Sequence, residues 1–218
     1  MKLRILITSI GGHYSHDLIR AVRKEHKSFI LGTDLKKNNN IFFVDAFKIL
    51  PNPKDEKNYL KILFEIIKKH KIKVVIPCSD AETIPISKNL KNFEKIGVKV
   101  PLSNYKIISL INNKFKLFKY LKRKNIDVGK FKKLDSINEL QKKLLEFNYP
   151  SKKIVLKPRF GGGSRGIIIL DERLKTFKYL LDDKSRFCGT SSLNNLKKET
   201  QKFNYKLKNY LIMPFHSN

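Results

Sequence analysis

Cysteine and long hydrophobic runs are scarce in this sequence of 218 residues. Its two cysteines, Cys78 and Cys188, cannot form the framework of several disulfides that is typical of small secreted proteins. No apolar run approaches the roughly 18–20 residues that a membrane span requires. The short apolar run near the N-terminus leads into Gly11-Gly12 and lacks a small-residue cleavage site, so it predicts a strand rather than a signal peptide. We therefore expect a cytoplasmic protein with free thiols and no membrane partner.

Acidic residues and arginine are also scarce, and this decides how the charge is interpreted. The 47 Lys+Arg exceed the 19 Asp+Glu and give a net charge of +28. Such a charge ordinarily indicates nucleic acid or an anionic surface. However, only 8 of the basic residues are arginine, which most often reads base edges, and the 39 lysines are spread over the whole chain. A lysine-rich composition explains the charge more simply, so we rank nucleic-acid binding last.

The first hundred residues alternate between short apolar runs and amphipathic segments. Strands are predicted over residues 3–10, 28–32, 73–77 and 97–101, and helices over residues 18–22, 59–71 and 81–93. Continuous apolar strands that alternate with helices are typical of a parallel sheet covered on both faces. We therefore predict a small doubly wound α/β domain. Its ligands should bind beyond the carboxyl ends of the strands, near residues 11–16, 34–40 and 78–82.

The second half has a different pattern, which predicts an α+β domain. Helices are predicted over residues 103–125, with a break at Asn112-Asn113, and over residues 136–147 and 174–181. Strands over residues 153–157 and 167–170 form an antiparallel hairpin around a glycine loop, a loop covers residues 188–195, and a final strand covers residues 210–213. We place the two domains at residues 1–110 and 111–218.

The most informative segment joins Lys157 to the loop Gly161-Gly162-Gly163-Ser164-Arg165-Gly166. Glycine lets the backbone approach a polyphosphate closely, and exposed N–H groups can donate to its oxygens. Lys157 would add a point charge and Arg165 a forked donor. The alternative is a plain hairpin, but four glycines in six residues are more than a tight turn needs. The segment therefore predicts phosphate binding.

Two acids and one thiol near residue 80 have competing interpretations. Asp80 and Glu82 would stabilise the dipole of the helix that begins there, and the family resemblance described below equally implies that they face a substrate. Cys78 follows a strand and could serve as a nucleophile, but no partner base is identifiable. We interpret Cys78 as an inert thiol and find no catalytic residue.

The order of these elements resembles the ATP-grasp superfamily, and most closely the carbamoyl-phosphate-synthase-like branch of carboxylate–amine ligases. The first domain resembles the pre-ATP-grasp domain of that family, and the second resembles the nucleotide-lid subdomain. The matching motifs are Gly11-Gly12, Gly32-Thr33-Asp34, Pro77-Cys78-Ser79-Asp80-Ala81-Glu82, Asn113-Lys114, Asn125-Ile126-Asp127-Val128, Lys157-Pro158 with the glycine loop, and Leu211-Ile212-Met213-Pro214-Phe215.

The resemblance implies a nucleotide site and a reaction. It places two lysines at the ATP phosphates, the glycine loop over them, and the backbone of residues 213–215 against the adenine. In the complete enzyme, ATP with Mg²⁺ would phosphorylate a small carboxylate, and an amine would then attack the acyl phosphate. For Lys114 the alternative is one more solvated helix lysine. The implied ATP-binding residues are Lys114, Lys157, Gly161, Gly162, Gly163, Ser164, Arg165, Gly166, Met213 and Phe215.

The sequence departs from the family pattern at two positions and at its end. Asn113 stands where the family often has aspartate, and Pro214 stands where a hinge acid is common. In the family, a second subdomain with the Mg²⁺ ligands follows the hinge, whereas this sequence ends at Asn218. Asp171, Glu172, Asp182 and Asp183 are interpreted as surface acids, so we find no metal set and expect little turnover by this chain alone. The alternatives are a non-catalytic nucleotide-binding module or one that a separate chain completes.

Overall fold

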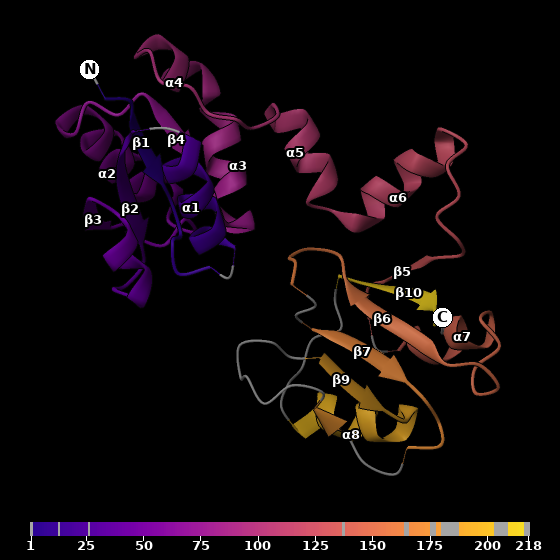
Figure 1. Cartoon of the computed structure of the whole chain (residues 1–218). Helices are drawn as coiled ribbons and strands as arrows, with labels where there is room; N and C mark the ends of the chain where they lie inside the picture. Colours follow the sequence, from indigo (N-terminus) through magenta and orange to yellow (C-terminus); the bar gives the residue numbers. More distant parts are fainter. Residues whose placement is uncertain are drawn as a thin grey trace. The chain divides into compact units, whose positions relative to one another are not determined.

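The structure is a computed structural model that describes residues 2–12, 14–25, 27–136, 138–163, 166–174, 178–179, 188–202 and 209–215 (Figure 1). The chain divides into two compact units, Met1–Ser109 and Leu110–Asn218. Each unit has buried hydrophobic clusters of its own. None of the helices described is both long enough and apolar enough to cross a membrane.

The first unit is a parallel four-stranded sheet with the strand order β3–β2–β1–β4. The chain therefore runs outward from β1 to β3 and then crosses back to β4, as predicted for a doubly wound domain. The elements are β1 (Arg4–Ile7), α1 (Ser15–Glu25), β2 (Phe29–Asp34), the 3₁₀ helix η1 (Asn39–Phe43), β3 (Ala46–Ile49), α2 (Glu56–Lys69), β4 (Val74–Ile76), α3 (Asp80–Lys88) and α4 (Leu90–Lys95). Helix α5 (Tyr105–Ile111) spans the division between the units.

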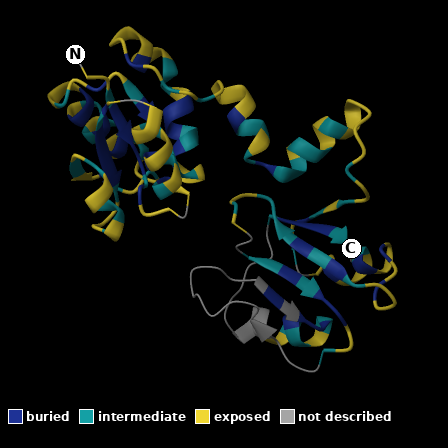
Figure 2. Ribbon diagram, in the orientation of Figure 1, coloured by how far each residue is buried: buried dark blue, intermediate teal, exposed yellow. Residues whose placement is uncertain are grey.

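Side chains of β1 alternate between two buried layers. Leu6 belongs to the cluster formed with α2, α3 and α4, whereas Ile5 and Ile7 belong to the cluster formed with Ile19 of α1. Successive side chains of a strand point to opposite faces, so a strand buried on both faces must be continuously apolar. Figure 2 shows β1 and β2 largely buried and the outer faces of the helices exposed, whereas the edge strand β3 is partly exposed.

Two predicted elements of the first unit were wrong in detail. The helix predicted over residues 81–93 is two helices, because Asn89 leaves the helical conformation (φ −111°, ψ 11°) and stands at the end of α3 and the start of α4. The strand predicted over residues 97–101 is reduced to an isolated parallel bridge between Val74 and Lys99.

The second unit contains a six-stranded sheet with the order β5–β10–β6–β7–β9–β8. Its strands pair antiparallel except β7 and β9, which pair parallel. The predicted hairpin of β6 and β7 and the predicted final strand are therefore present. The elements are α6 (Lys114–Arg123), β5 (Lys132–Leu134), α7 (Leu140–Leu145), β6 (Ile154–Pro158), β7 (Ile167–Leu170), β8 (Lys178–Tyr179), β9 (Cys188–Ser191), α8 (Leu193–Lys202) and β10 (Tyr210–Pro214).

One face of this sheet carries the core of the second unit. Ile154 and Leu156 of β6 and Ile212 of β10 are completely buried in a cluster with residues of α7 and α8. Because successive side chains of a strand point to opposite faces, Val155 and Lys157 lie on the other face of the sheet.

The predictions for residues 178–179 and 188–191 were wrong, and the rest of the helix predicted over residues 174–181 lies largely outside the described residues. Residues 178–179, predicted as helix, form β8, and residues 188–191, predicted as loop, form β9. Strand β9 has the sequence Cys-Gly-Thr-Ser, which carries no apolar alternation. Its pairing with β7, in which Ile167 lies opposite Cys188, fixes it as a strand, so a tertiary contact overrides a weak local preference.

Candidate functional site

The β6–β7 hairpin presents Lys157 on the face of the sheet opposite the core. Lys157 pairs with Leu211 of β10, and its neighbour Leu156 points into the core. Within the described part of the chain, the Lys157 ammonium group has no hydrogen-bond or ion-pair partner. A cation in this position can receive an anion without first breaking an internal ion pair.

Three glycines of the loop that follows adopt the left-handed backbone conformation. They are Gly161 (φ 85°), Gly163 (φ 64°) and Gly166 (φ 75°). A residue with a Cβ is strained in this conformation, so the hairpin turn itself requires glycine at these positions. The predicted site residues Ser164 and Arg165 lie outside the described residues.

Helix α6 brings Lys114 to this loop. Its N-cap, Asn113, is buried and accepts a hydrogen bond from the Lys116 N–H at 3.2 Å. The Lys114 N–H donates to the Arg159 carbonyl at 2.9 Å, and Lys114 Nζ donates to the Gly161 carbonyl. Lys114 thus contacts the glycine loop, which the interpretation as a solvated helix lysine did not anticipate.

Arg159 lies next to Lys114, two residues before Gly161, and the sequence analysis did not predict it as a site residue. Its side chain is only 12% exposed, its Nη1 lies 3.7 Å from Asp135 Oδ1, and its Nε is buried with no partner among the described residues. A buried donor without an acceptor is costly, so an anion nearby would satisfy it. The available signal was its position two residues after Lys157, which strand alternation places on the same face.

Strand β10 positions the other predicted residues. Met213 pairs with Val155 and shares the face of Lys157, and the Phe215 N–H donates to the Lys153 carbonyl at 3.1 Å. In an antiparallel ladder, alternate residues turn their backbone groups to opposite sides. The Pro214 carbonyl therefore faces away from β6. It also lies beyond the end of β5, because Ile212 is the last residue of β10 that pairs with β5.

The described acids near the loop form no metal site. Asp171 was predicted at the surface, but it is 8% exposed and pairs with Arg173 at 2.8 Å and with Lys153 at 3.1 Å. The hydrogen bonds from Arg173, reinforced by Lys153, hold the pKa of Asp171 well below its ordinary value. No group of three or more His, Cys, Asp or Glu side chains in the described ranges could hold a metal ion. These residues therefore do not fit Mg²⁺, and we derive no step through it.

A small pocket of about 210 Å³ lies at the carboxyl ends of the strands of the first unit. Its lining includes Asp34 from the end of β2 and Ser79 and Glu82 from the segment after β4. Asp34 accepts hydrogen bonds from the N–H groups of Gly11 and Leu35, both at 2.7 Å. The predicted ligand-binding loops thus meet at this edge.

Glu82 is buried beside this pocket, with 3% of its surface exposed. It accepts hydrogen bonds from the Thr8 hydroxyl at 2.6 Å, from the Tyr59 hydroxyl at 3.0 Å and from the Ser9 side chain. Burial raises its pKa above the ordinary value, although these hydrogen bonds act in the opposite direction. Glu82 therefore connects β1, α2 and α3, which is more than the helix-dipole interpretation anticipated.

The Cys78 thiol agrees with the interpretation of an inert group. Burial raises its pKa to about 11, so very little thiolate forms near neutral pH. Its Sγ lies 3.8 Å from the Ile76 carbonyl, within its own strand end. Nothing in this geometry activates it as a nucleophile.

Several solved enzymes share the fold of nearly the whole chain. A carboxyaminoimidazole ribonucleotide synthase from Aspergillus clavatus, solved with ATP, matches 99% of this chain and 47% of its own (TM-score 0.64, 14% identity). A biotin carboxylase from Campylobacter jejuni, solved as a beta-gamma-ATP complex, matches 99% and 45% (TM-score 0.59, 15% identity). An L-amino acid ligase from Bacillus licheniformis matches 98% and 44% (TM-score 0.58, 13% identity). The chain spans less than half the length of each.

These structural similarities identify the class of fold. The chain has the fold of the N-terminal part of ATP-grasp enzymes, which confirms the resemblance in the sequence. Residues 5–101, which lie in the first unit, match the family described as PylC-like, N-terminal domain. None of the curated proteins compared with the chain matches it.

Proposed function

We propose that the second unit binds the triphosphate of ATP and that the chain is the nucleotide-binding part of an ATP-grasp carboxylate–amine ligase. One observation carries the proposal. Lys114, which lies 47 positions before Gly161 in the sequence, donates to the carbonyl of that loop glycine, and its N–H binds Arg159, two residues after Lys157. Basic groups from a helix and a strand thus converge on one glycine loop.

The donors suit a polyphosphate. Lys114 and Lys157 are compact cations, whereas Arg159 offers a planar fork that matches two phosphate oxygens. The unpartnered Arg159 Nε gives a buried donor that an anion would satisfy. In this proposal a phosphate oxygen replaces the Gly161 carbonyl as the acceptor for Lys114 Nζ, and the loop N–H groups add further donors.

The face of β10 that carries Met213 suits a nucleobase. Met213 lies on the face of Lys157 and would pack against the adenine ring, with Phe215 following it. Because the Phe215 N–H is engaged with Lys153, we assign the Pro214 carbonyl as the acceptor for the adenine amino group. This replaces the hinge acid that the family commonly uses.

The ligase reaction requires more than these residues. By analogy with the solved relatives, the complete protein would transfer phosphate from ATP to a carboxylate, which an amine then attacks. Mg²⁺ would neutralise the charge that develops on the phosphates. Its ligands would come from outside the described residues, either from the same protein or from a separate chain. We therefore propose nucleotide binding for this chain and little turnover.

ATP titration into single-lysine variants tests the site. Lys157→Ala and Lys114→Ala should each weaken ATP binding by about 1.5–3 kcal/mol, roughly tenfold to a hundredfold, because each removes a charged donor to phosphate. Isothermal titration calorimetry with ATP measures the change. Lys119→Ala is the matched control, because this exposed lysine of the same helix removes the same charge away from the loop.

Adenosine separates the phosphate site from the base site. Since adenosine lacks phosphates, its affinity should be the same for wild type and Lys157→Ala. Equal ATP binding by wild type, Lys114→Ala and Lys157→Ala would show that the hairpin does not hold the triphosphate.

A further inference from the structure

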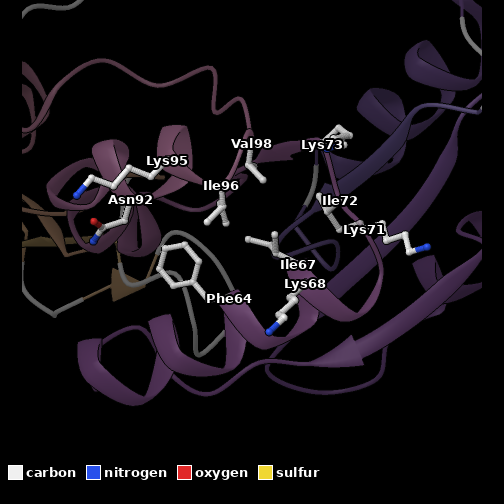
Figure 3. Close-up of a pocket in the computed structure, with 10 residues that line it drawn as sticks. All are labelled: Phe64, Ile67, Lys68, Lys71, Ile72, Lys73, Asn92, Lys95, Ile96 and Val98. Atoms are coloured by element: carbon white, nitrogen blue, oxygen red, sulfur yellow. The ribbon is translucent and has the colours of Figure 1, made fainter.

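A large groove lies in the first unit at the end of the sheet opposite the Glu82 pocket. It has a volume of about 890 Å³ and is bordered by the C-terminal ends of α2 and α4 and by the segment that leads into β4 (Figure 3). Ligands of doubly wound sheets ordinarily bind beyond the carboxyl ends of the strands, whereas this groove lies where β4 begins. It is therefore distinct from both sites described above.

Two helix ends with the same construction form the floor. After α2, Lys71 has a positive φ of 49° and the Ile72 N–H donates back to the Ile67 carbonyl at 3.0 Å. After α4, Gly97 has a φ of 70° and the Val98 N–H donates back to the Phe93 carbonyl at 3.0 Å. This is the Schellman arrangement, in which the residue after the turn packs back on its helix. Ile72 and Val98 thus enter the floor at equivalent positions.

The middle of the groove is apolar and partly open. Figure 3 shows the side chains of Phe64, Ile67, Ile96 and Val98 facing a common space. Ile67 and Val98 are almost completely buried, but Ile96 is 49% exposed. An exposed isoleucine beside buried ones forms a small apolar surface that a partner could cover.

Four lysines surround this apolar centre: Lys68, Lys71, Lys73 and Lys95. No acidic residue lines the groove, and none of the four has an ion-pair partner in the described part of the chain. Lys68 and Lys95 lie in the last turns of their helices, where they also stabilise the helix dipoles. Lys71 and Lys73 lie outside both helices, so that explanation does not cover them.

We propose that this groove binds an acidic amphipathic helix of a partner protein. In Figure 3 the amines of Lys68, Lys71 and Lys95 point outward from the apolar centre in different directions. A single headgroup could reach only one of them, whereas a helix with apolar residues on one stripe and Asp or Glu on both flanks pairs with several at once. A second copy does not fit, because two chains of net charge +28 repel each other.

A labelled synthetic peptide tests the proposal. The probe is a helical peptide of about 14 residues, or four turns, with leucines at one stripe and glutamates on both flanks. Fluorescence anisotropy at physiological salt should detect saturable binding to the full chain. A peptide of identical composition with the leucines scattered around the helix should bind at least about tenfold more weakly, a difference of about 1.4 kcal/mol.

Variants of the groove test its lysines and its apolar centre separately. Lys68→Glu with Lys95→Glu should weaken binding by about tenfold or more through like-charge repulsion, and Ile96→Asp should do the same by making the exposed centre polar. The matched control is Lys24→Glu with Lys27→Glu, which makes the same charge change at the end of α1, on the other layer of the sheet. It should change the affinity by less than about threefold.

Every outcome decides for or against the proposal. No binding of the amphipathic peptide, equal binding of the scattered peptide, or an equal loss in the α1 control overturns it, the last two because they indicate attraction by overall charge. Two further probes address other occupants: laurate, and vesicles of phosphatidylglycerol. Tighter, groove-dependent binding of either one would overturn the peptide assignment in favour of an acyl chain or a membrane surface. ATP affinity is measured in parallel, and it should be unchanged in all these variants.

Discussion

Glu82→Ala should lower the free energy of unfolding of the first unit by about 3–5 kcal/mol, the largest loss expected from any single polar residue described. The carboxylate accepts hydrogen bonds from Thr8, Ser9 and Tyr59, and alanine would leave these hydroxyls without an acceptor. Thr8 and Tyr59 are themselves completely buried, so water cannot replace the lost acceptor without opening the core. Urea denaturation followed by circular dichroism measures the loss.

Asp80→Ala is the control for this substitution. Asp80 is exposed and lies in the same first turn of α3, so it shares the favourable interaction with the helix dipole but not the buried hydrogen bonds. Its replacement should cost at most about 1 kcal/mol. Equal losses from the two substitutions would mean that Glu82 acts only through the helix dipole.

Glu82→Gln should be least harmful at high pH. The pKa of Glu82 in the folded protein is raised above its ordinary value of 4.5, so the folded state holds this proton more tightly than the unfolded state. The stability from this group is complete below the ordinary pKa and is lost as the pH rises through the raised one. Glutamine does not titrate, so the difference in unfolding free energy between wild type and variant should narrow as the pH rises above the ordinary value of 4.5. Urea denaturation at several pH values measures this difference in unfolding free energy. A difference that widens as the pH rises would contradict the prediction.

Leu156→Ala should destabilise the second unit by about 2–5 kcal/mol. Leu156 is completely buried at the centre of β6, between the strands β7 and β10 that pair with it and against the helices of the core. Removing its methyl groups leaves a cavity that the surrounding side chains fill only in part. ATP binding should weaken with it, because β6 carries Lys157.

Hydrogen exchange measured by mass spectrometry shows which part of the chain Leu156→Ala destabilises. Peptides from β6 and β10 should lose protection, whereas peptides from β1 and β2 should keep theirs, since the two units have separate cores. Val155→Ala is the matched control, because Val155 lies on the opposite face of the same strand and is only partly buried. A comparable loss from Val155→Ala would mean that the sheet is packed around Val155 as tightly as on its core face.

The predictions succeeded where local patterns are strong. The continuous apolar run of β1 can be buried on both faces only in a parallel sheet with helices on either side, and the first unit has that form. The break at Asn113 was also predictable, because its side chain caps α6. The prediction missed β9, which has no apolar alternation and is a strand only because it pairs with β7.

Part of the candidate site could likewise be predicted from the sequence, and part of it could not. Lys157 and its glycine loop were predictable, because they are adjacent in the chain and their chemistry is plain from residue type. The family resemblance also placed Lys114 at this loop, whereas the contribution of Arg159 and the lysine-rimmed groove were not predicted.

Sequence alone therefore determined the class of fold and the glycine loop between β6 and β7, since both follow from patterns of residues a few positions apart. The tertiary structure decided which of the 39 lysines lie at the glycine loop or surround an apolar surface. Lysines are locally indistinguishable in a chain so rich in them, and only the packing of distant elements assigns them neighbours.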